Sequence, residues 1–179
     1  AYDDAKTFAD DIKAAKQALK DAEDTILRNI ESMINSQMTR YNDFVYNQTR
    51  KAPEINLFDG TRYEFTTPDD TGTGTSYKSL IVFDLSILKL TQLPTLIHDS
   101  LIFNDIGYAP LEKIMELYTQ SSKQIFIAFD KKEAPTKAIQ KILDSASILH
   151  LSSDGNELFG ENWGRKKKDE EEDSAAPTK

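Results

Sequence analysis

Two aspartates that follow short apolar segments are the residues of this sequence best suited to chemistry. Asp99 ends the run at residues 95–99, and Asp130 follows a similar run at residues 124–129. A carboxylate at the end of a buried strand is unfavourable unless it is paired or used, and holding Mg²⁺ is a common use. An aspartate that caps the next helix explains Asp99 equally well, so both interpretations stay open at this point.

A second candidate site is the Gly/Thr-rich segment ahead of a helix expected at residues 77–90. Backbone N–H groups, hydroxyls, a lysine and the positive end of the helix dipole together favour an anion at such a place. The residues that we expect to contact it are Gly72, Gly74, Thr75, Ser76 and Lys78. The alternative is an ordinary loop in which Thr75 or Ser76 caps the helix. No G-x-x-x-x-G-K-[ST] sequence occurs in the chain, so a complete P-loop is absent.

The apolar pattern predicts an α/β fold that brings the two aspartates to one edge of a sheet. Short strands at residues 95–99 and 124–129 alternate with helical spans, which indicates βαβ units and a mostly parallel sheet. Such sheets bind ligands at the carboxyl ends of their strands. A helix at residues 135–144 and a further strand at residues 147–151 complete the prediction. His98 is interpreted as a packed strand residue rather than as a metal ligand.

Two further elements are expected before this sheet. Residues 3–49 lack Pro and Gly and predict one long helix, in which apolar residues recur every seven positions between residues 5 and 33. This spacing favours a coiled coil, although an amphipathic helix packed on its own domain is the alternative. After the break at Pro53, residues 55–58 and 62–66 flank Asp-Gly and predict a β-hairpin.

Composition limits the classes of function. The 179 residues carry a net charge of −8 and a pI near 4.8, which argues against a surface built to hold nucleic acid. No cysteine is present, which fits a cytoplasmic protein, and no apolar run is long enough for a membrane span. The first residue is Ala rather than Met, so we expect a fragment of a longer protein.

The composition also divides the chain. We expect a coiled-coil stalk at residues 1–50, an α/β lobe at residues 51–164 and a disordered charged tail at residues 165–179.

The order of these elements resembles the C-terminal half of an ABC-type ATPase head of the SMC/RecN class. More closely, three segments resemble the family called domain of unknown function 2326. They read YKSLIVFDLSILKLTQLPTLIHDSLIF, EKIMELYTQSSKQIFIAFDK and LFGENWGR. Members of that family form the C-terminal ends of SMC-like ATPases, several of them in bacterial three-component anti-phage defence systems. The resemblance covers about residues 55–163.

The resemblance implies a role for each candidate residue. Asp99 corresponds to the Walker B aspartate that holds Mg²⁺, and Asp130 stands where ABC ATPases have their switch histidine. Residues 72–78 take the place of the signature motif, which reaches the γ-phosphate of ATP held by the opposite head. ATP and Mg²⁺ are therefore expected to bind only together with a missing N-terminal lobe.

Two departures from the family pattern bear on catalysis. Ser100 stands where a glutamate usually follows the Walker B aspartate, and a serine cannot act as a general base toward water as a carboxylate can. The segment TGTGTSYK also lacks the usual LSGG letters. We expect hydrolysis to be slow, supported by Asp105 or Asp130, or absent, and the isolated chain to be inactive.

The favoured interpretation is half of an ATP-gated switch in a DNA-directed or anti-phage defence assembly. The expected partners are the N-terminal lobe and outgoing coiled-coil helix of the same protein, a second head, and proteins of the defence system. DNA is a further partner, though not through this acidic chain alone. One alternative is a non-enzymatic scaffold whose coiled coil recruits a partner. Another is a stand-alone metal-dependent hydrolase that uses Asp99, Asp105 and Asp130.

Overall fold

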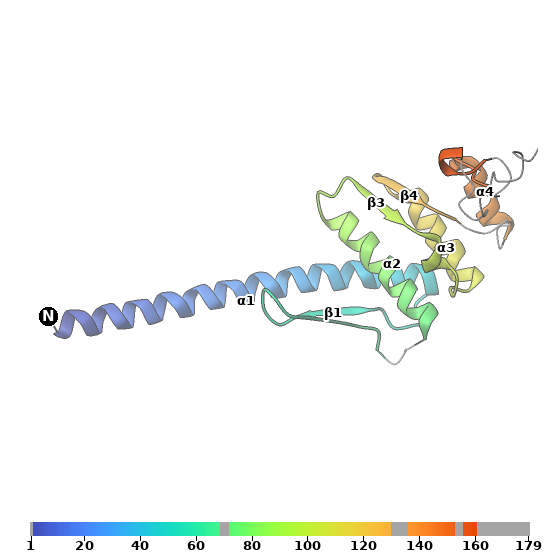
Figure 1. The fold of residues 1–179 in the computed structure, drawn as a ribbon. Helices are drawn as coiled ribbons and strands as arrows, with labels where there is room; N and C mark the ends of the chain where they lie inside the picture. The colour runs from blue at the N-terminus through green and yellow to red at the C-terminus, as the bar shows by residue number, and fades with distance from the viewer. Residues whose placement is uncertain (1, 69–71, 130–135, 153–155, 161–179) are drawn as a thin grey trace, which may run out of the picture. The chain divides into compact units, whose positions relative to one another are not determined.

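The computed structural model describes residues 2–68, 72–129, 136–152 and 156–160. The chain divides after Ile142 into two compact units. In chain order the elements are α1 (Tyr2–Tyr46), β1 (Glu54–Leu57), β2 (Tyr63–Thr66), α2 (Thr73–Leu90), β3 (Thr95–His98), the 3₁₀ helix η1 (Ser100–Phe103), α3 (Tyr108–Gln120), β4 (Gln124–Ile127), α4 (Lys137–Ala146) and the 3₁₀ helix η2 (Leu158–Gly160) (Figure 1). This is the predicted α/β class, with a long N-terminal helix, a hairpin and a small parallel sheet.

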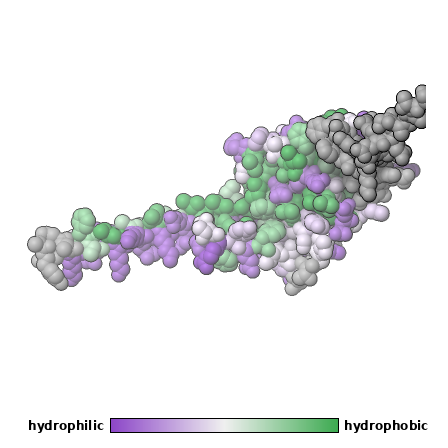
Figure 2. All heavy atoms as spheres, viewed as in Figure 1, coloured by the Kyte–Doolittle hydropathy of each residue, from purple (hydrophilic) through white to green (hydrophobic). Residues whose placement is uncertain are grey.

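Helix α1 has two halves that differ in burial. Ile34, Met38 and Val45 in its C-terminal half are buried, and Met38 is inaccessible to solvent. In the N-terminal half the heptad residues are exposed, for example Leu19 at 61% and Ile26 at 57%. Figure 2 shows the apolar side chains of this half gathered along one side of the helix. Only the C-terminal half therefore packs on the body of the first unit, and the coiled coil stays a prediction.

The hairpin is held against α1 by side chains of that helix. Strands β1 and β2 pair antiparallel, with Ile55 opposite Phe65, which confirms the predicted hairpin. Asn35 accepts a hydrogen bond from the Ile55 amide at 2.8 Å and donates one to the Ile55 carbonyl at 2.9 Å. Glu31 accepts from the Leu57 amide at 2.8 Å. These bonds occupy the outer edge of β1 as a neighbouring strand would.

The turn of the hairpin is organised by one aspartate. The Asp59 carboxylate accepts hydrogen bonds from the amides of Thr61 and Arg62, each at 2.8 Å. Bonds from the side chains of these two residues lower the pKa of Asp59 well below its usual range. The Phe58 amide donates to the Arg62 carbonyl at 3.0 Å, so the connection is longer than the two-residue turn that Asp-Gly favours.

Helix α2 lies in the core of the first unit, because it is apolar on several sides. Val82 joins Ile34 and Met38 of α1 and Ile55 of β1 in one buried cluster. On another side, α2 packs on η1 and on β3. The predicted burial of this helix is therefore observed.

Strands β3 and β4 form a two-stranded parallel sheet, as predicted. Leu96 lies opposite Ile125, and Ile97 lies opposite Phe126. The Ala128 amide donates to the His98 carbonyl at 2.9 Å and extends the pairing beyond the strand ends. Ile97 is 71% exposed and Phe126 is 43% exposed, so one face of the sheet is uncovered. Parallel sheets are normally covered on both faces, so among the described residues a layer is missing over this face.

Two predictions for the end of the chain have different outcomes. The helix predicted at residues 135–144 is found as α4, and Ile139 in it is buried. The strand predicted at residues 147–151 is wrong, because those residues form no ladder and the pairing found nearby is a single bridge between Ser152 and Asn156. Apolar alternation alone does not make a strand where the backbone finds no neighbour. Asp130 and the predicted tail from residue 165 lie outside the described residues.

Within the described ranges, none of the helices is long and apolar enough to cross a membrane.

The exposed seam of α1 generates a prediction about association. Ile12 is 46% exposed and Ile26 is 57% exposed, and burying each large side chain stabilises by about 1.5–3 kcal/mol. We expect the 179-residue chain either to self-associate through residues 5–33 or to leave that part of the helix frayed, and we expect Ile12→Asp with Ile26→Asp to abolish any such association. Light scattering over a range of concentrations measures the effect.

Gln17→Asp is the control, because Gln17 lies seven residues from both Asp10 and Asp24 on the charged face. A monomeric chain with strong amide protection at residues 12–26, unchanged by the two aspartates, would contradict the coiled coil. The helix would then pack on its own domain in solution.

Candidate functional site

Asp99 lies directly after β3, at the carboxyl end of the parallel sheet. Its Oδ1 accepts a hydrogen bond from the Ser100 amide at 2.7 Å and thereby caps η1. The Ser100 hydroxyl donates to the same oxygen at 3.3 Å. The side chain is exposed, and within the described residues its Oδ2 atom makes no hydrogen bond. The helix cap is therefore real, yet it leaves one carboxylate oxygen available to a ligand.

This donor set fits one ligand of Mg²⁺ and not a complete metal site. Across the residues that the structure describes, no group of three or more His, Cys, Asp or Glu side chains is arranged to hold a metal ion. Mg²⁺ usually keeps several waters and binds through one or two carboxylates together with substrate phosphates. Asp99 can supply one such carboxylate, and the remaining ligands must come from phosphate, water or another polypeptide.

The Gly/Thr-rich segment is more helical than predicted. Helix α2 begins at Thr73, so Gly74, Thr75 and Ser76 belong to its first turn and Gly72 occupies the N-cap position without a side-chain cap. The alternative, in which Thr75 or Ser76 caps the helix, is therefore wrong. Thr75 is buried, and the Ser76 amide donates to the Gly72 carbonyl at 3.0 Å. The first turn of a helix still directs backbone N–H groups away from the helix, where an anion is favoured.

Lys78 occupies a place that the sequence did not indicate. It is 1% exposed, its Nζ donates to Asn42 Oδ1 at 3.1 Å, and it lies 5.1 Å from the centre of the Tyr46 ring. Asn42 is itself buried and donates to the Arg50 carbonyl at 2.8 Å. The Lys78 ammonium therefore faces α1, where it links α2 to the end of that helix, and does not face the surface beside Gly72.

Gly74 brings the two predicted sites together. A Cβ atom at this position would lie 2.1 Å from the carbonyl oxygen of Asp105 and 3.1 Å from its carbonyl carbon. The first turn of α2 therefore touches the backbone of the loop that follows η1, six residues after Asp99. Only a residue without a side chain allows this approach. The Asp105 side chain is exposed, whereas Asp130 lies outside the described residues.

A buried polar network at the end of β3 was missed by sequence reasoning. His98 is 5% exposed, which confirms its interpretation as a packed residue. Its Nδ1 lies 2.6 Å from the Tyr118 hydroxyl of α3, and its Nε2 lies 3.1 Å from Asp84 Oδ2 of α2. Burial and then the nearby Asp84 charge raise the pKa of Tyr118 far above its usual range. The signal in the sequence was Asp84, the one acid of a mostly apolar helix.

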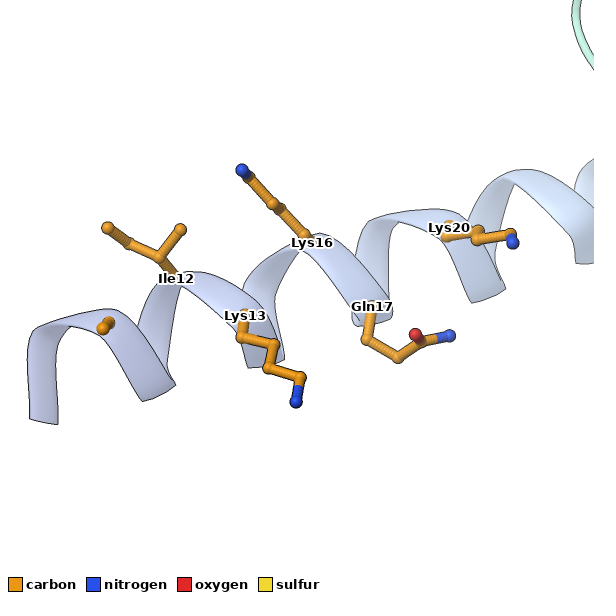
Figure 3. Close-up of a pocket in the computed structure, with 6 residues that line it drawn as sticks. Ile12, Lys13, Lys16, Gln17 and Lys20 are labelled. Carbon is orange, nitrogen blue, oxygen red and sulfur yellow. The ribbon is translucent and has the colours of Figure 1, made fainter. Parts of the chain in front are cut away.

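The pocket along α1 does not belong to this site. Its lining residues come from the exposed half of the helix and are Ala9, Ile12, Lys13, Lys16, Gln17 and Lys20. Figure 3 shows these side chains projecting from successive turns of one helix. It is an open hollow without a second wall and contains none of the predicted site residues.

The close approach at Gly74 predicts a specific loss of stability. Gly74→Ala forces the Asp105 backbone to move, and we expect the free energy of unfolding to fall by about 1–3 kcal/mol, as for other overpacked sites. Urea denaturation followed by circular dichroism measures the change. Gly60→Ala is the control, because nothing lies within 4 Å of a Cβ atom there. Equal effects of the two variants would contradict the contact.

The raised pKa of Tyr118 predicts alkaline sensitivity. The unfolded chain ionises this tyrosine near pH 10, whereas the folded chain holds the proton to higher pH. The contribution to stability is therefore complete below about pH 10 and is lost as the pH rises further. In Tyr118→Phe we expect the free energy of unfolding at pH 7 to fall by about 1–3 kcal/mol, because His98 Nδ1 loses its partner.

The decline of stability above about pH 10 should also be shallower in Tyr118→Phe than in the unchanged chain. Denaturation curves at pH 7, 9 and 10.5 test both expectations. Tyr108→Phe is the matched control, because Tyr108 lies on the same helix and is 62% exposed. An equally steep decline in Tyr118→Phe would contradict the assigned cause.

This chain is similar to known proteins both in sequence and in fold. The profile of a family described as an uncharacterised protein conserved in bacteria (DUF2326) matches residues 41–163. A solved chain from a structural study of the ATP-driven dimerization and DNA-stimulated activation of SMC ATPases is similar in fold, with a TM-score of 0.53 and 13% sequence identity. The match covers 75% of this chain and 84% of that chain. No curated protein matches. The chain therefore belongs to the DUF2326 family of bacterial proteins, and its fold is similar to that of an SMC ATPase.

Proposed function

We propose that this chain is the C-terminal half of an SMC-like ABC ATPase head, which acts in an ATP-gated dimer. The observation that carries the proposal is the position of Asp99. It ends a parallel strand with one carboxylate oxygen free of hydrogen bonds among the described residues, and the loop that follows it touches the first turn of α2 at Gly74. Ligands of open parallel sheets bind at such strand ends. The likeness to an SMC ATPase supports the same arrangement.

In this proposal the chain contributes two elements to nucleotide binding. Asp99 holds Mg²⁺ in the manner of a Walker B aspartate, and Mg²⁺ when bound neutralises charge on the ATP phosphates. The first turn of α2, at residues 72–76, takes the place of the signature motif and faces the γ-phosphate of ATP held by a second head. Lys78 is not part of this contact, because its ammonium is buried against α1.

The residues present support ATP hydrolysis less than they support ATP binding. Ser100 stands where a catalytic glutamate usually follows, and its hydroxyl donates to Asp99 rather than accepting a proton from water. Asp105, in the loop after η1, and Asp130, which follows residues 124–129 in the sequence, are the acids proposed to replace the glutamate. Nucleotide binding and head dimerization depend on fewer groups than hydrolysis does, so the proposal assigns an ATP-gated switch first and an ATPase second.

Two exposed apolar surfaces support the proposal that an N-terminal lobe of the same protein packs on this chain. The uncovered face of the β3–β4 sheet carries Ile97 and Phe126 side by side, as expected if further strands and a helix of the same protein complete it. An outgoing coiled-coil helix accounts in the same way for the exposed seam of α1. DNA contact is assigned to the assembled protein, and anti-phage defence partners in the cytoplasm are proposed from the family resemblance.

The competing proposal is a non-enzymatic scaffold. It is favoured by the same exposed seam of α1, which suits recruitment of a partner helix without any nucleotide. The two proposals differ in what Asp99 does, since a scaffold needs that residue only as the cap of η1.

Substitution of Asp99 tests the central assignment. In the protein that also contains the P-loop lobe, we expect Asp99→Asn to lower Mg²⁺-dependent ATP binding at least about tenfold, because charge-assisted metal ligation is lost. The amide oxygen can still accept from the Ser100 amide, so the melting temperature should change little. Fluorescent-ATP titration and thermal denaturation measure the two effects.

Glu64→Gln is the control, because Glu64 is an exposed acid on β2 that takes no part in the proposed site. A variant of Asp99 that unfolds while nucleotide binding per folded molecule stays unchanged would assign the carboxylate to the helix cap alone.

Nucleotide binding by the chain alone is the second test. The sequence contains no P-loop and therefore only one wall of the proposed site, so we expect no measurable ATP affinity in the micromolar range. Isothermal titration calorimetry with ATP and Mg²⁺ measures it, and the same titration after mixing with the P-loop lobe is the positive control. Micromolar affinity of the isolated chain would contradict the division of the site between lobes.

A further inference from the structure

The residue directly before Asp99 is held by three elements of the first unit. The His98 side chain contacts Tyr118 of α3 at 2.6 Å and Asp84 of α2 at 3.1 Å, and its backbone carbonyl accepts from the Ala128 amide after β4 at 2.9 Å. The ring also packs edge-on against the Tyr118 ring, with centroids 5.7 Å apart. The position is 5% exposed, so these contacts form largely without competing water.

Chemistry assigns the protons in this network. An ionised carboxylate only accepts hydrogen bonds, so His98 Nε2 carries the proton that is shared with Asp84. In the neutral ring Nδ1 is then an acceptor, and the Tyr118 hydroxyl donates to it. With a neutral ring the order of donation is Tyr118 to His98 to Asp84, and both ring nitrogens have a partner. Asp84 is partly exposed, which keeps its carboxylate in contact with water.

An apolar residue would fill this position without needing any partner. Leucine or isoleucine at the end of β3 would bury as much surface and would permit several rotamers, whereas two short hydrogen bonds in a dry environment permit one ring orientation. The network thus contributes orientation rather than burial. One peptide bond joins His98 to Asp99, so fixing the position of His98 also restricts the backbone of Asp99.

We infer that His98 is a positioning residue for Asp99. By joining α2, α3 and β4 to the end of β3, it sets the backbone direction from which the Asp99 carboxylate projects, and the cap on Ser100 uses Oδ1 and leaves Oδ2 without a hydrogen bond among the described residues. The metal-related part of this inference rests on the proposed function, whereas the ordering of residues 98–100 does not.

Amide hydrogen exchange of the 179-residue chain tests the ordering without any nucleotide. The two reporters are the Ala128 amide, which donates to His98, and the Ser100 amide, which donates to Asp99. In His98→Leu we expect both to exchange about tenfold faster, the factor that corresponds to roughly one lost hydrogen bond. The Ile55 amide, which donates to Asn35, is the internal reference and should not change.

Three further variants make the result specific. His98→Asn retains a polar atom near the position of Nδ1 and should restore part of the protection. Tyr118→Phe removes one bond and keeps the histidine, so it should accelerate exchange at Ser100 even if His98→Leu fails to fold. Ile81→Val is the packing control, because it trims a fully buried residue on the helix that carries Asp84. If Ile81→Val accelerates the reporters as much as Tyr118→Phe does, His98 is ordinary core and the inference is overturned.

A second experiment distinguishes failure of this inference from failure of the proposed function. In the protein with its P-loop lobe, His98→Leu should raise the Mg²⁺ concentration for half-maximal ATP binding about tenfold, and His98→Asn should restore part of the affinity. An unchanged Mg²⁺ dependence in His98→Leu, alongside a clear effect of Asp99→Asn, overturns positioning but leaves the proposed function standing. If Asp99→Asn itself has no effect, the proposed function fails, and the exchange result alone decides whether His98 orders the strand end.

Discussion

The rest of the first unit depends on one constraint, which is that the apolar sides of α2 must be buried. This helix is apolar on several sides, and a helix of that kind must be covered on each of them. The C-terminal half of α1 and the hairpin cover one side, where Val82 meets Met38 and Ile55, while β3 and η1 cover another. Strand β3 is thereby held against α2, while β4 pairs with β3 and α3 packs on α1, and the strand end that carries Asp99 acquires a defined place.

Polar contacts from the same helix convert this packing into a specific arrangement. Lys78 links α2 to Asn42 of α1, Asp84 links it to His98 at the end of β3, and Gly74 lets its first turn touch the backbone at Asp105. Buried polar groups are costly unless they are satisfied, so the Lys78 and Asp84 links favour one register of the helix against its neighbours, and the close approach at Gly74 restricts that register sterically. The first turn of α2 and the strand end that carries Asp99 are consequently parts of one connected structure.

The exposed surfaces of the sheet and of α1 are apolar, as surfaces inside a folded protein are. Ile97 and Phe126 lie beside each other on a parallel sheet, and such sheets are stable when both faces are covered. The first half of α1 carries an apolar stripe on one side and charges on the other (Figure 2). The exposed sheet face and stripe agree with a chain that works as one lobe of a larger head. A compact enzyme with its own complete site would be expected to cover them.

The sequence by itself determined the class of fold, the order of the elements, the hairpin, the parallel sheet and the burial of His98. These follow from periodicity and turn chemistry, which act within a few residues. It also indicated Asp99 as the acid at a strand end, but left open whether that acid caps a helix. Only the tertiary structure decided that Asp99 caps η1 through Oδ1 and that Oδ2 makes no hydrogen bond among the described residues. It also decided that Lys78 is buried and that residues 147–151 form no strand. The contacts of His98 with Asp84 and Tyr118 were likewise visible only there. Each of these depends on which distant segment lies alongside, and local patterns carry no information about that.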